Sequence, residues 1–151
     1  MNLIIDASVL IKFFVPEVLS AKAEQLLARV EGGSVKLFAP DLIYAEAGNT
    51  LWKKRRLKEL TQSEVGKITD LISSIPLKVE ASKTLFPLAI DIAIAYEVTV
   101  YDALYLSMAK VYETQMMTAD RKLFDLTAKT NLKRSVMWLG NYDHLIAQIP
   151  R

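Results

Sequence analysis

Four acidic residues have the type and spacing to carry out chemistry together: Asp6, Glu46, Asp102 and Asp120. Asp6 and Asp120 each follow a short apolar run that is typical of a buried strand. Glu46 and Asp102 lie in helical segments whose other residues are mostly apolar, so we expect each carboxylate to need a partner. Carboxylates that lie close together repel one another and need a counter-charge to stay ionised. A hard divalent cation, Mg²⁺ or Mn²⁺, supplies that charge with oxygen ligands alone.

Each of these acids also has an ordinary structural interpretation when it is taken alone. Asp6 could close a turn, Asp120 could cap the helix that follows it, and the helix dipole favours Asp102 in a first turn. Most helical glutamates are solvated, and Glu46 could be one of them. The functional hypothesis therefore depends on the four acids together, and we expect them to converge on one acidic pocket. An ion bound by them would lower the pKa of a bound water and neutralise phosphate charge, which predicts phosphodiester hydrolysis.

Composition excludes several other kinds of site. The chain has 151 residues and no cysteine, which removes disulfides, thiolate metal sites and cysteine nucleophiles. His144 is the only histidine, so a multi-histidine metal site is excluded, and no Gly-x-Ser-x-Gly elbow accompanies it for a catalytic triad. No glycine-rich dinucleotide or Walker motif is present. A net charge of +2 permits nucleic-acid binding without requiring it.

Length and hydropathy predict the general class of protein. Hydrophobic residues make up 52% of the chain and charged residues 24%, which is typical of one folded domain spanning residues 1–151. The apolar runs are much shorter than the roughly 20 residues of a membrane-spanning helix. The N-terminus lacks the basic region of a signal peptide. We therefore expect a cytoplasmic protein that is not associated with a membrane.

Strand-like and helix-like segments alternate along the chain, which predicts a three-layer α/β/α domain with a five-stranded, mainly parallel sheet. We expect strands at residues 3–5, 37–39, 76–80, 115–118 and 135–139. We expect helices at residues 20–31, 42–58, 101–112 and 121–128, with two more opening near residues 61 and 82 and a short turn at residues 8–14. Parallel sheets of this kind bind ligands beyond the carboxyl ends of their strands, where Asp6 and Asp120 are expected.

Local signals predict several helix boundaries and faces. Asp41 is expected to cap the long helix, and Thr61 and Glu64 have the spacing of a capping box. One apolar face is expected on the helix that opens at Ser82 or Thr84, formed by Leu85, Leu88, Ala89, Ile92 and Ala95. Four large aromatic residues are expected in the core: Trp52, Tyr101, Tyr105 and Trp138.

Basic residues near the acids are candidates for binding a substrate phosphate. Arg121 and Lys122 directly follow Asp120, and Lys12 lies shortly after Asp6. The basic run at residues 53–56 could contact RNA or could be a solvated helix end favoured by the dipole.

Four stretches of the chain resemble the motifs of the PIN-domain family, and within it the VapC-type toxins of prokaryotic toxin–antitoxin pairs: residues 4–12, 39–46, 100–106 and 117–123. The resemblance implies five parallel strands between helices, Mg²⁺-dependent (or Mn²⁺-dependent) cleavage of RNA, a homodimer, and inhibition by a small cognate antitoxin. It makes Asp6, Glu46, Asp102 and Asp120 the catalytic acids. Within this set we expect Asp6, Asp102 and Asp120 to bind the metal directly or through water, and Glu46 to orient or deprotonate the attacking water.

The resemblance also gives roles to neighbouring positions. Ser8 and Thr118 fall where a hydroxyl commonly lines the site. Lys122 stands two positions after the last aspartate, where some family members carry a further acid that bears on binding of a second metal.

Three other functions remain as alternatives. A PIN-like module could bind RNA or a protein without cutting, although the intact acidic quartet argues against this. A free-standing RNA-processing nuclease would use the same site without an antitoxin. An aspartyl phosphatase of the haloacid-dehalogenase type also opens with a strand that ends in Asp6, but it needs a second aspartate where Ser8 stands.

Overall fold

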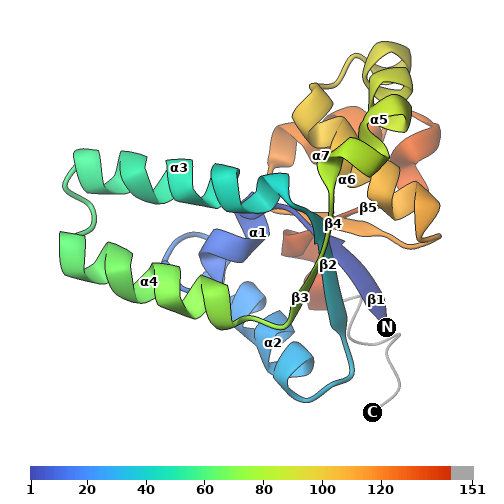
Figure 1. Cartoon of the computed structure of the whole chain (residues 1–151). Coiled ribbons are helices and arrows are strands. Elements are labelled where there is room, and N and C mark those ends of the chain that lie inside the picture. The colour runs from blue at the N-terminus through green and yellow to red at the C-terminus, as the bar shows by residue number, and fades with distance from the viewer. Residues whose placement is uncertain (144–151) are drawn as a thin grey trace.

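A parallel β-sheet forms the centre of the protein in the computed structural model, which describes residues 1–143 (Figure 1). Its strands are β1 (Asn2–Ile5), β2 (Lys36–Pro40), β3 (Leu77–Glu80), β4 (Met116–Thr118) and β5 (Val136–Trp138). They lie in the order β3-β2-β1-β4-β5, and every neighbouring pair is parallel. All five predicted strands are confirmed. The last three residues of the central strand β1 are fully buried, which explains why this stretch of the sequence is an apolar run.

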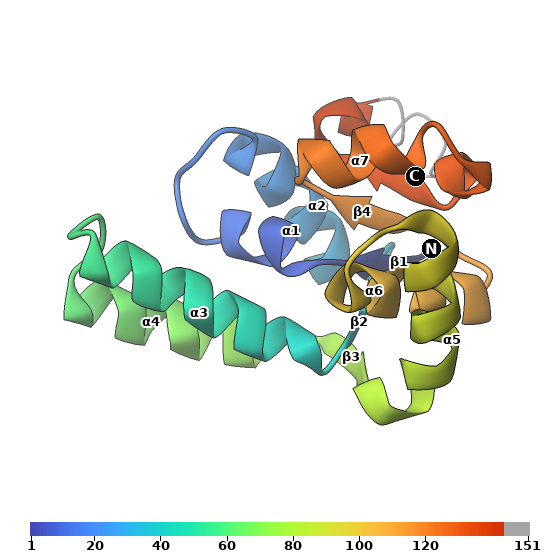
Figure 2. The same cartoon turned by 90° about the horizontal axis from the view of Figure 1, so that it is seen from above.

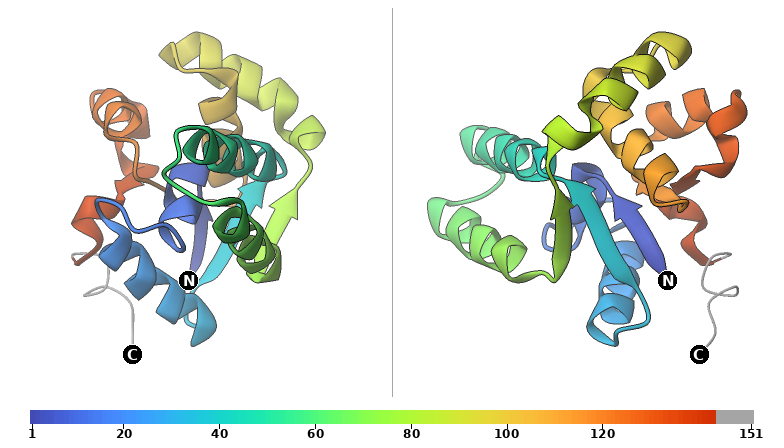
Figure 3. Two further views of the ribbon diagram at one scale, coloured as in Figure 1. Left: turned by 90° about the vertical axis from the view of Figure 1, so that its left-hand side faces the viewer. Right: turned by 45° about the vertical axis from the view of Figure 1, so that its right-hand side comes forward.

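Helices cover both faces of this sheet, as predicted for a three-layer α/β/α fold. They are α1 (Ala7–Lys12), α2 (Ser20–Glu31), α3 (Leu42–Arg56), α4 (Gln62–Ser74), α5 (Ser82–Tyr96), α6 (Val100–Val111) and α7 (Arg121–Thr127). Helices α1 to α4 lie on one side and α5 and α6 on the other, while α7 packs on β4 and β5 (Figure 3). Two short 3₁₀ turns flank β5: η1 (Asn131–Arg134) and η2 (Leu139–Asn141).

Helices α3 and α4 lie side by side and extend away from the sheet as a pair (Figure 2). The predicted capping box opens α4: the Thr61 hydroxyl accepts from the Glu64 amide at 3.2 Å, and the Glu64 carboxylate accepts from the Thr61 amide at 2.7 Å. Helix α2 has the predicted bounds and ends at Gly32 and Gly33, where Gly33 adopts a left-handed φ of +76°.

Asp41 occupies the predicted N-cap position of α3, but its side chain forms no capping hydrogen bond. The backbone of Asp41 is already helical, with φ −59° and ψ −20°, unlike the extended backbone of a typical capping residue. The carboxylate accepts instead from the backbone amide (3.0 Å) and the hydroxyl of Ser82. Asp41 therefore ties the start of α3 to the start of α5.

The prediction that four aromatic residues are buried is only partly correct. Tyr105 is 1% exposed and Trp138 is half-buried, but Trp52 is 53% exposed and Tyr101 is 60% exposed. Trp52 lies in the second half of α3, which extends away from the sheet, and Tyr101 lies in the first turn of α6. An apolar pattern along a helix does not show which of its turns pack on the sheet and which extend beyond it.

The apolar face predicted on α5 is also only partly buried. Leu85, Ala89 and Ile92 are buried, Leu88 is half-buried, and Ala95 is exposed one residue before the helix ends. Within residues 1–143 no single helix is long and apolar enough to cross a membrane, and the bent pair α5 and α6 meets that test only when the two are counted together.

Candidate active site at the carboxyl edge of the sheet

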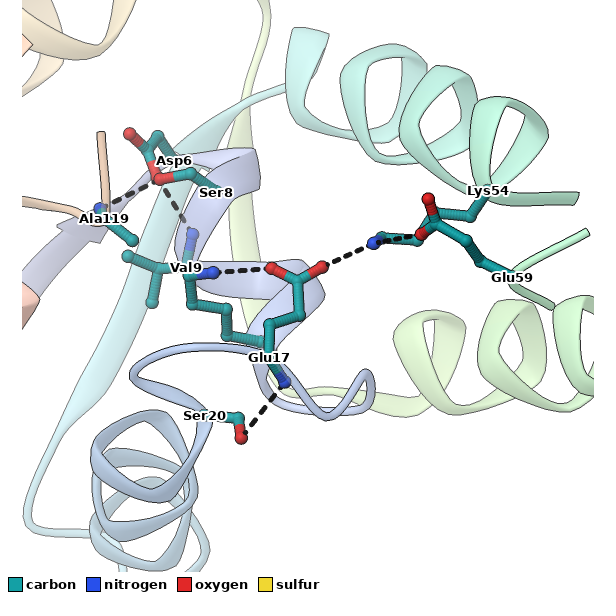
Figure 4. Close-up of polar contacts among 9 residues, drawn as sticks. Asp6, Ser8, Val9, Glu17, Ser20, Lys54, Glu59 and Ala119 are labelled. Atoms are coloured by element: carbon teal, nitrogen blue, oxygen red, sulfur yellow. Dashed lines mark hydrogen bonds and ion pairs between the residues drawn. The ribbon is translucent and has the colours of Figure 1, made fainter. Parts of the chain in front are cut away.

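Asp6 lies at the carboxyl end of β1 and is almost completely buried, with 7% exposure. Its Oδ1 accepts hydrogen bonds from the Ser8 hydroxyl at 2.5 Å and the Val9 amide at 3.1 Å (Figure 4). Its Oδ2 accepts from the Thr118 hydroxyl at 2.5 Å. All three donors are neutral, so they fix the direction of the carboxylate without cancelling its charge.

The two predicted hydroxyl positions connect the end of β1 to the end of β4. Ser8 Oγ accepts from the Ala119 amide at 2.9 Å (Figure 4), and Thr118 Oγ1 accepts from the Asp120 amide at 2.9 Å. Each hydroxyl therefore donates to Asp6 and accepts from the chain after β4. Because β1 and β4 are neighbouring parallel strands, these bonds bring Asp6 and the loop that carries Asp120 to the same edge.

Glu46 enters this edge from α3. Its side chain is half-buried, and its Oε2 accepts from the Tyr105 hydroxyl at 2.5 Å. Glu46 lines a hollow of about 320 Å³ together with Ser8, Lys12 and residues of α1 and α3. The Glu46 carboxylate has the hydrogen-bond partner that was expected, but the hollow around it is lined by polar as well as apolar side chains.

Asp102 and Asp120 line a second hollow of about 270 Å³. Asp102 lies in the first turn of α6 and accepts from the Thr99 hydroxyl at 2.8 Å. Asp120 is exposed and caps α7, because its Oδ1 accepts from the backbone amides of Lys122 at 2.8 Å and Leu123 at 3.2 Å. Asp120 therefore has the ordinary capping role that the sequence also allowed.

Burial and repulsion from a neighbouring acid raise the pKa values of three site carboxylates. Burial raises the pKa of Asp6 from 3.8 to about 6, with a further contribution from Glu46 and opposition from its hydrogen bonds. Burial raises the pKa of Glu46, the charge of Asp102 adds to this, and the Tyr105 hydroxyl opposes it. Burial likewise raises the pKa of Asp102, where Asp120 adds to the effect. The pKa values of Asp6, Glu46 and Asp102 are therefore each raised in part by the charge of a neighbouring acid.

Among residues 1–143, no basic side chain forms an ion pair with these acids. Within the described part of the chain, Asp6, Glu46, Asp102 and Asp120 form no ion pair, whereas other acids such as Glu17 and Asp125 do. All partners of the four acids are hydroxyls or backbone amides. The site therefore carries negative charge and offers only oxygen donors, which is the donor chemistry of Mg²⁺ and Mn²⁺.

The arrangement differs from the expectation that all four acids share one pocket. They are divided between the two hollows and the buried end of β1, and in residues 1–143 no three acidic or histidine side chains are grouped closely enough to hold a metal ion. Asp6 hydrogen-bonds to Ser8 and Thr118, whereas Asp120 hydrogen-bonds to the first amides of its own helix. The site fits a divalent ion in donor type and charge but not in the spacing of its side chains.

The predicted phosphate-binding residues have different surroundings. Lys12 lines the first hollow, but its Nζ pairs with Glu17 at 2.6 Å, and Glu17 also pairs with Lys54 at 2.8 Å (Figure 4). The Arg121 guanidinium donates to Asp125 and lies 4.5 Å from the centre of the Trp138 ring. Lys122 lines the second hollow beside Asp102 and Asp120, and forms no ion pair with a described residue.

The basic run at the end of α3 also has partners within the chain. Lys54 is held by Glu17 and Glu59, and the Arg56 guanidinium lies 4.9 Å from the centre of the exposed Trp52 ring. For Lys54 and Arg56, these contacts favour the interpretation as a structured helix end over a role in RNA binding. His144 lies outside the described residues.

Sequence reasoning missed three residues at this edge: Thr99, Tyr105 and Glu17. Thr99 stands three positions before Asp102 and caps α6, a spacing that could have identified it. Tyr105 was expected in the core, and its ring is there, but nothing local indicates that its hydroxyl meets Glu46 from another layer. Glu17 lies in the connection between α1 and α2 and has no sequence signal.

Comparisons with known proteins agree with this fold. Over 125 residues the chain is 31% identical to Ribonuclease VapC3 of Pyrobaculum aerophilum, covering 82% of this chain and 92% of the relative. The crystal structure of PAE2754 from the same organism superposes with a TM-score of 0.71 at 26% identity, over 98% of this chain and 91% of that one. A chain of a Klebsiella pneumoniae toxin–antitoxin complex has the same fold, with a TM-score of 0.60 at 13% identity, over 89% and 94% of the two chains.

The PIN domain model matches residues 3–129, which include all four acids. This chain therefore belongs to the PIN domain family.

Asp6 makes the stability of the metal-free protein depend on pH. Because the pKa of Asp6 is raised from 3.8 to about 6, the folded protein binds a proton that the unfolded chain releases over this range, so stability increases as pH falls through 6 and levels off below 3.8. The full effect corresponds to about 3 kcal/mol. Thermal unfolding in EDTA should show a higher melting temperature at about pH 5 than at about pH 8.

The variant Asp6→Asn should lose the larger part of this difference because its side chain cannot ionise. Asp70→Asn, at an exposed position of α4, serves as the control and should keep the difference. An Asp6→Asn protein with the full wild-type difference between the two pH values would contradict the assignment.

Proposed function

We propose that this protein is a divalent-metal-dependent endoribonuclease that hydrolyses RNA phosphodiester bonds, and that it is the toxin of a toxin–antitoxin pair. The proposal rests on four acids at the carboxyl edge of a PIN fold that form no ion pair within the described part of the chain. The relative that is 31% identical is a ribonuclease, which supports the same activity here.

The acids divide into two roles in this proposal. Asp6, Asp102 and Asp120 would hold Mg²⁺ or Mn²⁺. The bound ion supplies a water of lowered pKa and neutralises charge on the phosphate. Glu46 orients or deprotonates the attacking water, and its raised pKa suits a general base that acts near neutral pH.

Neutral and basic side chains support this chemistry. Ser8 and Thr118 fix both oxygens of Asp6, so the carboxylate keeps one direction while substrate binds. Lys122 lies beside Asp102 and Asp120 and is the best placed of the candidate basic residues to bind a backbone phosphate. Lys12 and Arg121 would bind a phosphate only after breaking their ion pairs with Glu17 and Asp125, respectively.

The partners are an RNA substrate, a small cognate antitoxin and a second copy of the chain in a homodimer. The Klebsiella pneumoniae neighbour was solved in a toxin–antitoxin complex, which makes an antitoxin a reasonable partner to test for. A small reading frame next to the gene, encoding a DNA-binding protein, would favour the toxin over a free-standing RNA-processing nuclease. A cytoplasmic location follows from these partners and stays a prediction.

One observation favours a different function, a PIN-like module that binds RNA or protein without cutting. No three acids are grouped closely enough to hold a metal ion in the described residues. A titration with Mn²⁺ separates the two functions, because a protein that binds no Mn²⁺ at millimolar concentration would be the inert module.

Cleavage of RNA should require both a divalent ion and Asp6. Wild-type protein should cleave a mixed RNA pool in Mg²⁺ or Mn²⁺ and lose this activity in EDTA. Asp6→Asn should lower the rate by roughly 100-fold or more, since it removes a ligand charge from the site without removing side-chain volume. Asp70→Asn removes a similar carboxylate far from the site and should cleave like wild type.

Circular dichroism of both variants checks that they are folded. Full activity of a folded Asp6→Asn protein, or equal activity in EDTA, would contradict the proposed function.

Lys122 should affect the binding of RNA more than the chemical step. Lys122→Gln is expected to raise KM several-fold with little change in kcat, and to reduce the salt dependence of RNA binding by about one phosphate contact. Lys129→Gln, an exposed lysine just beyond α7, is the matched control. An unchanged KM and salt slope in Lys122→Gln would remove this residue from the substrate-binding surface.

A further inference from the structure

The hydroxyl of Tyr105 forms a buried contact with the candidate general base. Tyr105 is 1% exposed, and its hydroxyl donates to Glu46 Oε2 at 2.5 Å. The two residues are 59 positions apart and come from α6 and α3, which lie on opposite sides of the sheet. A buried tyrosine hydroxyl needs a hydrogen-bond partner, and here that partner is a site carboxylate.

The surroundings of this hydroxyl keep it protonated. Burial raises the pKa of Tyr105 far above its ordinary value, the hydrogen bond to Glu46 and the charges of Glu46 and Asp6 add to this, and the backbone of Ala7 opposes it. The Tyr105 hydroxyl therefore acts as a neutral donor to Glu46. This hydroxyl lies between the Glu46 carboxylate and the backbone of Ala7 at the start of α1.

Glu46 depends on this donor for its direction. A glutamate side chain has several rotatable bonds, and fixing them costs conformational entropy. Within the described residues no other side chain donates to its carboxylate, because the Thr50 hydroxyl bonds to the backbone carbonyl of Glu46. The Tyr105 bond uses Oε2 and leaves Oε1 free at a residue that lines the first hollow.

We propose that Tyr105 is a positioning residue whose hydroxyl fixes the Glu46 carboxylate so that its second oxygen meets the attacking water. The proposal depends on the ribonuclease function proposed above. Residues that orient a reacting group through one hydrogen bond commonly affect the rate without touching substrate.

The same helix region provides a matched control. Tyr112 follows α6 directly, and its hydroxyl donates to Glu80 at 3.2 Å, away from the four acids. Replacing either tyrosine with phenylalanine removes one hydroxyl that bonds to a glutamate and keeps the ring. Of these two tyrosines, Tyr105 contacts a proposed catalytic residue and Tyr112 does not.

The test compares wild type, Tyr105→Phe and Tyr112→Phe by steady-state cleavage of one RNA in saturating Mg²⁺, by Mn²⁺ affinity from electron paramagnetic resonance, and by melting temperature. Tyr105→Phe should lower kcat by roughly 10- to 100-fold. Its KM and its Mn²⁺ affinity should change less than about threefold, because Glu46 is not proposed to bind the ion. Tyr112→Phe should match wild type in kcat, KM and Mn²⁺ affinity.

Two outcomes with an active wild-type enzyme would overturn the positioning role. One is a folded Tyr105→Phe protein with wild-type kcat. The other is a loss of kcat with an equal loss of Mn²⁺ affinity or of substrate affinity, which would mean that Tyr105 does not act through Glu46 on the water. A wild-type protein that binds Mn²⁺ but does not cleave RNA would instead remove the proposed function, and this result is visible before any variant is compared.

Discussion

Repulsion among four carboxylates, none of which forms an ion pair with any residue from 1 to 143, governs the chemistry of this site. Glu46 raises the pKa of Asp6, Asp102 raises that of Glu46, and Asp120 raises that of Asp102, each in addition to burial. Hydroxyl groups hold three of these acids and backbone amides hold the fourth, so direction is fixed while negative charge remains. Such a site is costly for the isolated chain, and its charge and oxygen donors, though not the spacing of its side chains, suit a divalent cation.

The parallel sheet creates this situation by placing the ends of β1 and β4 side by side. Ser8 and Thr118 then connect the two ends through Asp6, and α3 and α6 bring Glu46 and Tyr105 from the two helical layers. The hydrogen bonds are individually ordinary. Together they join α1, α3 and α6 to the ends of β1 and β4, so the site is built from residues that lie far apart in the sequence.

The sequence predicted those parts of the fold and site that depend on local patterns. Apolar runs identified the five strands, and the positions of Asp6 and Asp120 after two of them indicated the carboxyl edge. Long-range side-chain partners could not be predicted in the same way. The bond from Asp41 to Ser82 and the bond from Tyr105 to Glu46 join positions 41 and 59 residues apart, so they depend on how separate helices meet. Exposure of Trp52 likewise depends on how far α3 extends from the sheet.

The central claim is that a divalent cation relieves the repulsion among these carboxylates. The most direct measurement is calorimetric titration of Mn²⁺ at about pH 6 in two buffers that differ in ionisation enthalpy, which counts the protons released on binding. Because the pKa of Asp6 is about 6 and those of Glu46 and Asp102 are also raised, binding should release protons, and fewer should be released at about pH 8. Binding without proton release at either pH, or no binding at millimolar Mn²⁺, would contradict the account.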